Sequence, residues 1–278
     1  MNKTDKFVRS AFAGMIGLGM VMAVARAGAE SIPQVVQVVK VEGNAQYSVD
    51  GRTWQTLHSG DVLKPGAVIR TAERSLVDVT LGEEGATSGS FNGPNLLNMP
   101  GGGGVGAGGG SGAGASDTET ANIVRIFEST VLGVDKLTLD RTGVDEVSDT
   151  QLDLRAGQIM GNVKKLSAQS RYEIKVPNGV AGIRGSWYLY SSAGTLVIGD
   201  GFGRRAGPNA NGVLETSDVP AHHKYDAGLD QVVIVSDADF NQYAAIYQDM
   251  CNSAGGLPGP RIRTYDHTCG PTCATDTQ

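Results

Sequence analysis

Residues Asn178 to Tyr190 read NGVAGIRGSWYLY, and this stretch decides how the rest of the chain is interpreted. Two glycines, Gly182 and Gly185, flank Arg184, and an aromatic run follows directly. Glycine permits a positive φ or the close approach of a neighbouring strand. An arginine in an apolar stretch needs acceptors for its N–H groups. The stretch therefore predicts a strand that ends in a turn, where Arg184 donates to carbonyls or to a carboxylate.

Arg184 has two interpretations. In the structural one it ties a turn at the end of the strand stack, and in the functional one it binds an anion or a partner. The structural role is favoured, because most arginine pairings in a β scaffold are architectural. Trp187 and Tyr188 are neighbours on the following strand, and strand side chains alternate between faces. One of the two is therefore expected in the core and the other half-exposed.

The residues before this stretch follow a β pattern. Residues 34–43 read QVVQVVKVEG, and 44–57 read NAQYSVDGRTWQTL, two strands around an Asp50-Gly51 turn. Residues 75–81 alternate apolar and polar side chains. Turn signals recur about every 8 to 12 residues, the spacing of an all-β domain.

A glycine-rich segment interrupts this pattern at about residues 84–121. Its central part, 101–116, is nearly all Gly, Ala and Ser, a composition typical of a flexible solvated loop. The β pattern resumes afterwards, which favours an insertion within one domain. The alternative is a linker between two domains, but the roughly 50 residues before it are few for an independent fold.

The C-terminal part, residues 205–278, is an extension with a strand, one amphipathic helix at about 237–251 and an irregular tail. Ser236 stands three residues before Asp239, a helix-capping arrangement. The apolar residues that share one face at helical spacing are Phe240, Tyr243, Ala244, Tyr247 and Met250.

Residues 1–29 have the features of an export signal. Lys3, Lys6 and Arg9 precede the apolar run SAFAGMIGLGMVMAVA, and small residues offer cleavage after Ala27 or Ala29. Cleavage is favoured over an uncleaved anchor, because the run is short for a span of about 20 residues. The mature chain is expected in the periplasm or outside the cell, with no integral membrane span.

The charge of the chain argues against one class of function, and its cysteines predict a disulfide. The 278 residues carry a net charge of −6, which argues against nucleic-acid binding. The three cysteines are Cys251, Cys269 and Cys273; in an oxidising compartment two of them are expected to pair, with the connectivity left open.

Catalytic, metal-binding and cofactor-binding residues are not predicted. His222 and His223 are adjacent, so on a strand they point to opposite faces and make poor joint ligands. The glycine-rich run lacks the lysine-serine ending of a phosphate-binding loop. We therefore expect a protein that is not an enzyme and holds no cofactor.

Two motifs resemble the FecR-type domain, the periplasmic domain of iron-dicitrate sigma-factor regulators. Residues 50–82 are similar to the family pattern W-x-x-L-x-x-G-x-x-L-x-x-G-x-x-I-x-T. Residues 177–188 resemble its closing segment TP-x-x-VAGVRGT-x-F, with Ser186 and Tyr188 in place of the threonine and phenylalanine. The matching positions are Trp54, Leu57, Gly60, Leu63, Gly66, Ile69 and Thr71, then Pro177, Val180, Ala181, Gly182, Ile183, Arg184 and Gly185.

The resemblance implies a FecR-like domain at 30–204, built of stacked short strands like a β-helix or β-roll, with a β-sandwich as the alternative. It transfers no catalytic residue and implies contact with proteins outside the cytoplasm. The predicted function is non-catalytic binding of a protein or a surface polymer at the cell envelope. The alternatives are a signal-sensing component related to FecR-type regulation and a self-associating subunit of an extracellular assembly, to which exposed strand edges would contribute.

Overall fold

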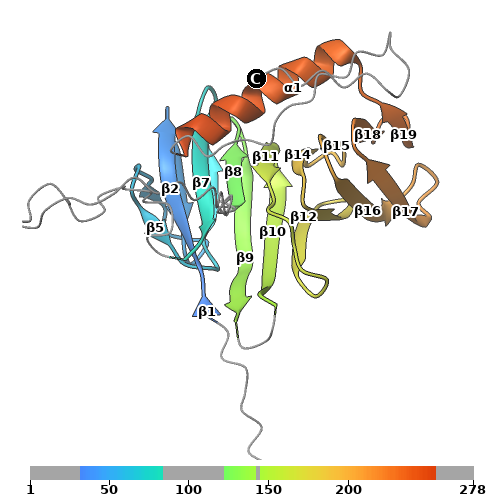
Figure 1. Cartoon of the computed structure of the whole chain (residues 1–278). Coiled ribbons are helices and arrows are strands. Elements are labelled where there is room, and N and C mark those ends of the chain that lie inside the picture. Colours follow the sequence, from blue (N-terminus) through green and yellow to red (C-terminus); the bar gives the residue numbers. More distant parts are fainter. Residues whose placement is uncertain (1–31, 84–121, 142–144, 255–278) are drawn as a thin grey trace, which may run out of the picture.

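Two large β-sheets and one helix make up the part of the chain that the structure, a computed structural model, describes: residues 32–83, 122–141 and 145–254 (Figure 1). The predicted export signal, the glycine-rich insertion, Cys269 and Cys273 lie outside these ranges. The prediction of an all-β protein with a single C-terminal helix is confirmed for the described residues.

Sheet A contains β13, the strand that carries most of the second motif. Its order from one edge to the other is β17 (Leu214–Pro220), β16 (Phe202–Pro208), β13 (Gly179–Arg184), β12 (Arg171–Val176), β10 (Val147–Ala156), β9 (Val131–Asp140), β6 (Val68–Thr71), β3 (Ala45–Ser48) and β4 (Gln55–Thr56), with β1 (Ile32–Pro33) also pairing with β9.

Sheet B faces sheet A across the main core. Its order is β19 (Gln231–Ile234), β18 (His223–Asp226), β15 (Leu196–Ile198), β14 (Trp187–Ser191), β11 (Gln158–Asn162), β8 (Asn122–Ile126), β7 (Leu76–Gly82), β2 (Val35–Glu42) and β5 (Val62–Leu63).

The chain advances along both sheets by switching between them. The hairpin β12–β13 lies in sheet A, β14–β15 in sheet B, β16–β17 in sheet A again, and β18–β19 in sheet B. Neighbouring strands pair antiparallel, except that β10 and β12 pair parallel. The result combines the two expected architectures: the sheets face each other as in a sandwich, while the chain builds the stack hairpin by hairpin as in a roll.

Strands from both sides of residues 84–121 share the same sheets. β7 pairs directly with β8, and β6 pairs with β9. One apolar core lies between the sheets and includes Leu57 and Ile69 from the first motif with Ile174 and Ile183 from the second half. Neither half of the sequence therefore has a separate core among the described residues.

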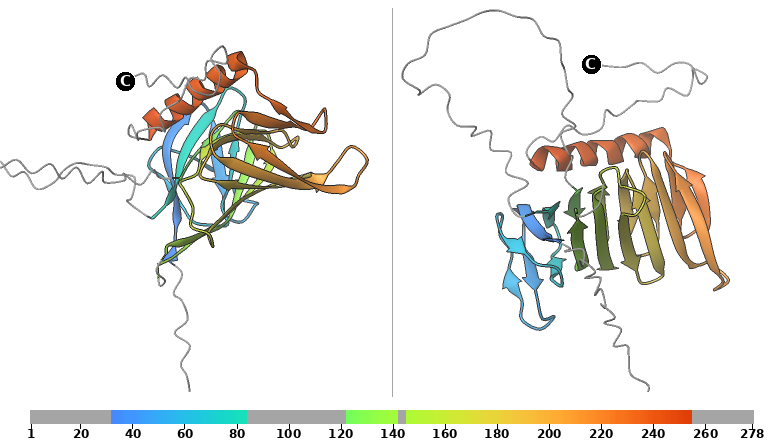
Figure 2. Two further views of the ribbon diagram at one scale, coloured as in Figure 1. Left: turned by 45° about the vertical axis from the view of Figure 1, so that its right-hand side comes forward. Right: turned by 60° about the horizontal axis from the view of Figure 1, so that its bottom comes forward.

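The helix α1 (Asp237–Ser253) covers the outer face of sheet B and forms a third layer (Figure 2). The Ser236 hydroxyl accepts a hydrogen bond from the Asp239 amide at 3.2 Å, as the capping pattern predicts. The helix extends two residues beyond the predicted end at 251. Phe240, Tyr247 and Met250 are buried against the sheet.

Trp187 and Tyr188 correct the expectation that one of them is half-exposed. Both are buried, with 3% and 0% of their surface exposed. They do point to opposite faces of β14, so that Tyr188 enters the core between the sheets. Trp187 points outward, where α1 covers it: its ring lies 5.3 Å from that of Tyr247 and 5.4 Å from that of Phe240.

A buried ion pair fastens the C-terminal part of α1 to sheet B. Arg125 on β8 donates from Nε and Nη2 to the two carboxylate oxygens of Asp78 on β7, both at 2.7 Å. Its Nη1 donates to Asp249 of α1, also at 2.7 Å. The side chains of Arg125 and Asp78 are 3% and 0% exposed. Sequence reasoning did not identify this cluster, whose only signal is an arginine within the apolar strand NIVRI.

Candidate binding groove on sheet A

The second motif lies beside a groove on the outer face of sheet A. Across four strands, Glu173 of β12 pairs with Gly182 of β13, which pairs with Arg204 of β16, which pairs with Asp218 of β17. Gly182 has no side chain, and a Cβ placed there would meet no atom within 4 Å. The missing side chain leaves a hollow between the flanking rows of longer residues.

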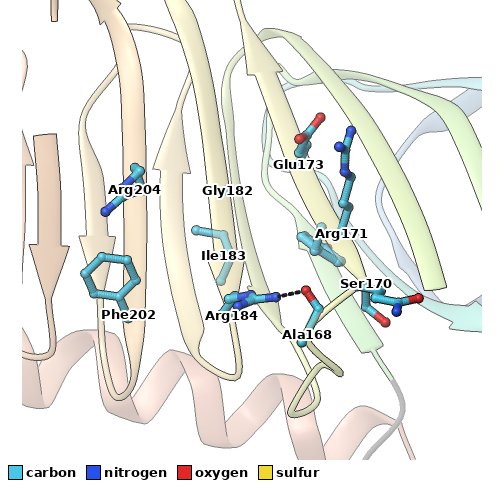
Figure 3. Close-up of a pocket in the computed structure, with 11 residues that line it drawn as sticks. Ala168, Ser170, Arg171, Glu173, Gly182, Ile183, Arg184, Phe202 and Arg204 are labelled. Carbon is cyan, nitrogen blue, oxygen red and sulfur yellow. Dashed lines mark hydrogen bonds between the residues drawn. The ribbon is translucent and has the colours of Figure 1, made fainter. Parts of the chain in front are cut away.

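The groove, which is open to solvent, has a volume of about 650 Å³; the residues that line it are drawn in Figure 3. It is lined from the loop before β12 and from β12, β13 and β16, by Ala168, Gln169, Ser170, Arg171, Tyr172, Glu173, Gly182, Ile183, Arg184, Phe202 and Arg204. Three of these side chains are cationic, and one is a carboxylate.

Arg184 lies at one end of the groove, where β13 ends. Its Nη2 donates to the carbonyl oxygen of Ala168 at 2.7 Å and to that of Ser167 at 3.2 Å. These bonds tie β13 to the loop before β12, as the structural interpretation requires. The side chain is nevertheless exposed, and its Nε and Nη1 donate no hydrogen bond to any residue in the described ranges. Arg184 thus has donors left for a ligand.

Arg171 and Arg204 add positive charge to the same face. Arg171 is exposed and forms no ion pair with any described residue. Arg204 donates to both carboxylate oxygens of Asp218, at 2.6 and 3.1 Å. Hydrogen bonding to Arg204 lowers the pKa of Asp218, so both partners stay charged at neutral pH.

The groove has a net positive charge, whereas the protein as a whole is negatively charged. With Arg204 offset by Asp218, Arg171 and Arg184 face a single carboxylate, that of Glu173. The whole chain carries a charge of −6. Phe202, directly across from Arg184 on β16 and half-buried, adds an apolar surface. The arrangement fits an anionic group attached to an apolar one.

The first motif lies away from the groove, at the other end of the stack. Gly60 and Gly66 form turns with φ of 93° and 96°, which explains the glycines. The Thr71 hydroxyl donates to the Phe127 carbonyl at 2.5 Å and accepts from the Thr130 amide at 3.0 Å. Trp54 is half-buried, and the Arg70 guanidinium lies 3.9 Å from its ring centre. The contacts of these residues are all within the protein, which is consistent with a structural role for the first motif.

Other residues of the second motif are also placed by the fold. Pro177 follows β12 at an exposed turn, and Gly185 takes a φ of 57° immediately after Arg184. The hydroxyls of Tyr188 and Tyr172 lie 2.9 Å apart in the core. Burial raises the pKa of both phenols, so they remain neutral. Of the motif positions, Gly182, Ile183 and Arg184 line the groove.

Sequence reasoning missed Arg171, Phe202 and Arg204 as groove residues. Arg171 lies 13 positions before Arg184 in the sequence, and Phe202 and Arg204 lie 18 and 20 positions after it. Only the strand register of β12, β13 and β16 brings them together. Outward-facing positions alternate along each strand, but alternation alone does not state which strands are neighbours.

The described residues contain no group of three or more His, Cys, Asp or Glu side chains that could hold a metal ion. Cys251 lies buried on α1, and burial raises the pKa of its thiol. Its two candidate partners are outside the described residues, so the disulfide stays a prediction. Nor does any described helix have the length and apolarity that crossing a membrane requires.

Comparison with known proteins gives structural neighbours only. No protein-family model matches the chain, and no curated protein matches it. Two crystal structures of a candidate anti-sigma factor from Parabacteroides distasonis, at 1.65 and 2.50 Å resolution, are similar to it at 9% and 8% identity, each with a TM-score of 0.33. The similar region covers 46% of this chain and 57% of each neighbour.

Proposed function

We propose that the protein is a non-catalytic binding module that acts outside the cytoplasm and recognises an acidic segment of a partner protein through the groove. The observation that carries the proposal is the pair Arg171 and Arg184, both exposed, beside a hollow left open by Gly182 on a protein that is acidic overall. The location rests on the predicted export signal at residues 1–29.

The chemistry of the groove favours a carboxylate ligand. A guanidinium presents paired N–H groups that match the two oxygens of a carboxylate. The hollow is open, which suits an extended segment that lies across the strands better than a small molecule enclosed on all sides. Phe202 provides the contact for an apolar residue next to an acidic one.

Binding of an acidic peptide tests the proposal. A labelled peptide of alternating glutamate and tyrosine should bind the wild-type protein, and more weakly as salt is raised, because the attraction is partly screened. Replacing Arg171 and Arg184 together by alanine should raise its dissociation constant by at least about tenfold, or about 1.4 kcal/mol. Fluorescence anisotropy measures both quantities.

Three comparisons make this result specific. Arg52→Ala removes an exposed positive charge at a distant turn and should leave binding unchanged. Gly182→Gln should fill the hollow and weaken binding. The free energy of unfolding should fall by less than about 1 kcal/mol in Arg52→Ala and Gly182→Gln, whose side chains face outward. The double variant should lose about 1 to 3 kcal/mol, because it removes the hydrogen bonds from Arg184 to Ala168 and Ser167, and binding is compared under conditions in which every variant is folded. Equal binding by the double variant and the wild type would refute the proposal, as would equal binding of a glutamine-tyrosine peptide. Tighter binding of an acidic polysaccharide than of the peptide would show that the ligand of the groove is a polysaccharide and not a protein segment.

A FecR-type signalling role is the second candidate. The observation in its favour is that the motif VAGIRG, on which the resemblance rests, supplies Gly182 and Arg184 to the groove. In that case the acidic segment would belong to a membrane transducer. Capture of such a transducer from a membrane extract by the wild type, and not by the Arg171/Arg184 double variant, would support this role.

A further inference from the structure

The edge strands at the two ends of the strand stack differ in length. At one end, the edge strands β4 and β5 have two residues each. Short edge strands are a common means of preventing a sheet from pairing with another chain. At the other end, sheet A finishes at β17, which has seven residues and a length of about 23 Å, and sheet B finishes at β19 (Figure 2).

The long-edged end also exposes apolar side chains. Val213 and Leu214, at the start of β17, are 60% and 82% exposed. Leu229 and Ile234, at the turn before β19 and at the end of that strand, are 61% and 69% exposed. Scattered exposed apolar residues are ordinary, but four at one end of a stack mark a contact surface.

The backbone of β17 has hydrogen-bonding groups directed away from β16. The Asn209 amide donates to the Val213 carbonyl at 2.8 Å, which makes residues 209 and 213 a hydrogen-bonded pair. Antiparallel pairs alternate, so Glu215, Ser217 and Val219 bond toward β16. The N–H and C=O groups of Leu214, Thr216 and Asp218 point outward, where no described strand pairs with them.

We infer that β17 pairs with β17 of a second copy of this chain, antiparallel and centred on Ser217. In this register Thr216 faces Asp218 of the second copy, and each pair exchanges two backbone hydrogen bonds. Leu214 faces Pro220, so the apolar residues meet, and the N–H that Pro220 lacks is needed only at the two ends of the new ladder.

The charges of β17 are compatible with this pairing. Asp218 is held by Arg204 of its own chain, which offsets its charge where it approaches the second copy. Glu215 faces Val219 and not another carboxylate in the centred register. A register centred on Asp218 would instead place two aspartates opposite each other, which is unfavourable. A second copy is the occupant that this edge fits, because the edge is complementary to itself.

The self-association is tested on the full chain by sedimentation velocity over roughly a hundredfold range of concentration. The wild type should form a dimer. The double substitution Leu214→Lys/Ile234→Lys should raise the dimer dissociation constant by at least about tenfold. Val49→Lys is the matched control: Val49 is 67% exposed at the short-edged end, and its substitution should change nothing.

The register has its own test. Ser217→Cys should give a disulfide-linked dimer under mild oxidation beyond the wild-type background, because in the centred register the two Ser217 Cα atoms lie about 4.5 Å apart. Glu215→Cys, four residues out of register with its own copy, should not. A wild type that stays monomeric, a lysine variant that dimerises as the wild type does, or equal cross-linking at 215 and 217 would overturn the inference.

Discussion

Replacing Arg125 by methionine is expected to lower the free energy of unfolding by about 3 to 5 kcal/mol. The substitution keeps an unbranched side chain of similar length but leaves the Asp78 carboxylate, which is 0% exposed, without the cation that binds both its oxygens. An uncompensated buried charge is among the largest single destabilising effects in a protein. Urea unfolding followed by circular dichroism measures the loss.

The controls for Arg125 separate burial from ion pairing. Arg204 and Asp218 form the same two-point contact on the surface, with 59% and 53% of their side chains exposed, so Asp218→Ala should cost less than about 1 kcal/mol. The double variant Arg125→Met/Asp78→Leu should recover most of the lost stability, because a well-packed apolar pair replaces a buried ion pair at little cost. A single variant as stable as the wild type would contradict the conclusion that the buried Asp78 carboxylate depends on Arg125 for its charge partner.

Replacing Trp187 by alanine is the second large effect that we expect, again about 3 to 5 kcal/mol. The indole fills the space between β14 and α1 and is stacked on Tyr247 at an interplanar angle of 16°. Its removal leaves a cavity that the sheet and the helix cannot easily close. The exchange of the α1 amides with solvent should then be faster in the variant than in the wild type, and the increase should be larger in α1 than in the core strands. Hydrogen-exchange mass spectrometry detects this change.

Trp54 provides the comparison for Trp187, since the chain has two tryptophans. Trp54 is half-buried and contacts Arg70 on the surface of sheet A, so Trp54→Ala should cost about 1 kcal/mol. Its effect on hydrogen exchange in α1 should be nil. Similar losses for the two substitutions, or unchanged protection of α1 in the Trp187 variant, would show that the helix does not depend on the indole.

The sequence predicted some residues of the groove, but it predicted neither the others nor the open edge of sheet A at β17. Gly182 and Arg184 were identifiable beforehand, because a glycine-flanked arginine is unusual in an apolar strand. Arg171, Phe202 and Arg204 were not, because each is an ordinary outward-facing residue until the strand order brings it to the groove, with Arg204 opposite Gly182 and Phe202 opposite Arg184. The same holds for the open edge of β17, which is an edge only because no further strand follows it in sheet A among the described residues.

Local sequence patterns were enough to predict the local structure. Alternation of apolar side chains placed the strands, glycines such as Gly60 and Gly66 placed the turns, and Ser236 placed the start of the helix, because each of these depends on the conformation of a few adjacent residues. What covers each face of a sheet could be read only from the packing of the folded chain. Trp187 is buried because α1 crosses sheet B, and Arg125 is paired because β7, β8 and α1 meet at one point. Strand register and helix placement are set by contacts between residues far apart in the chain, and no local pattern specifies them.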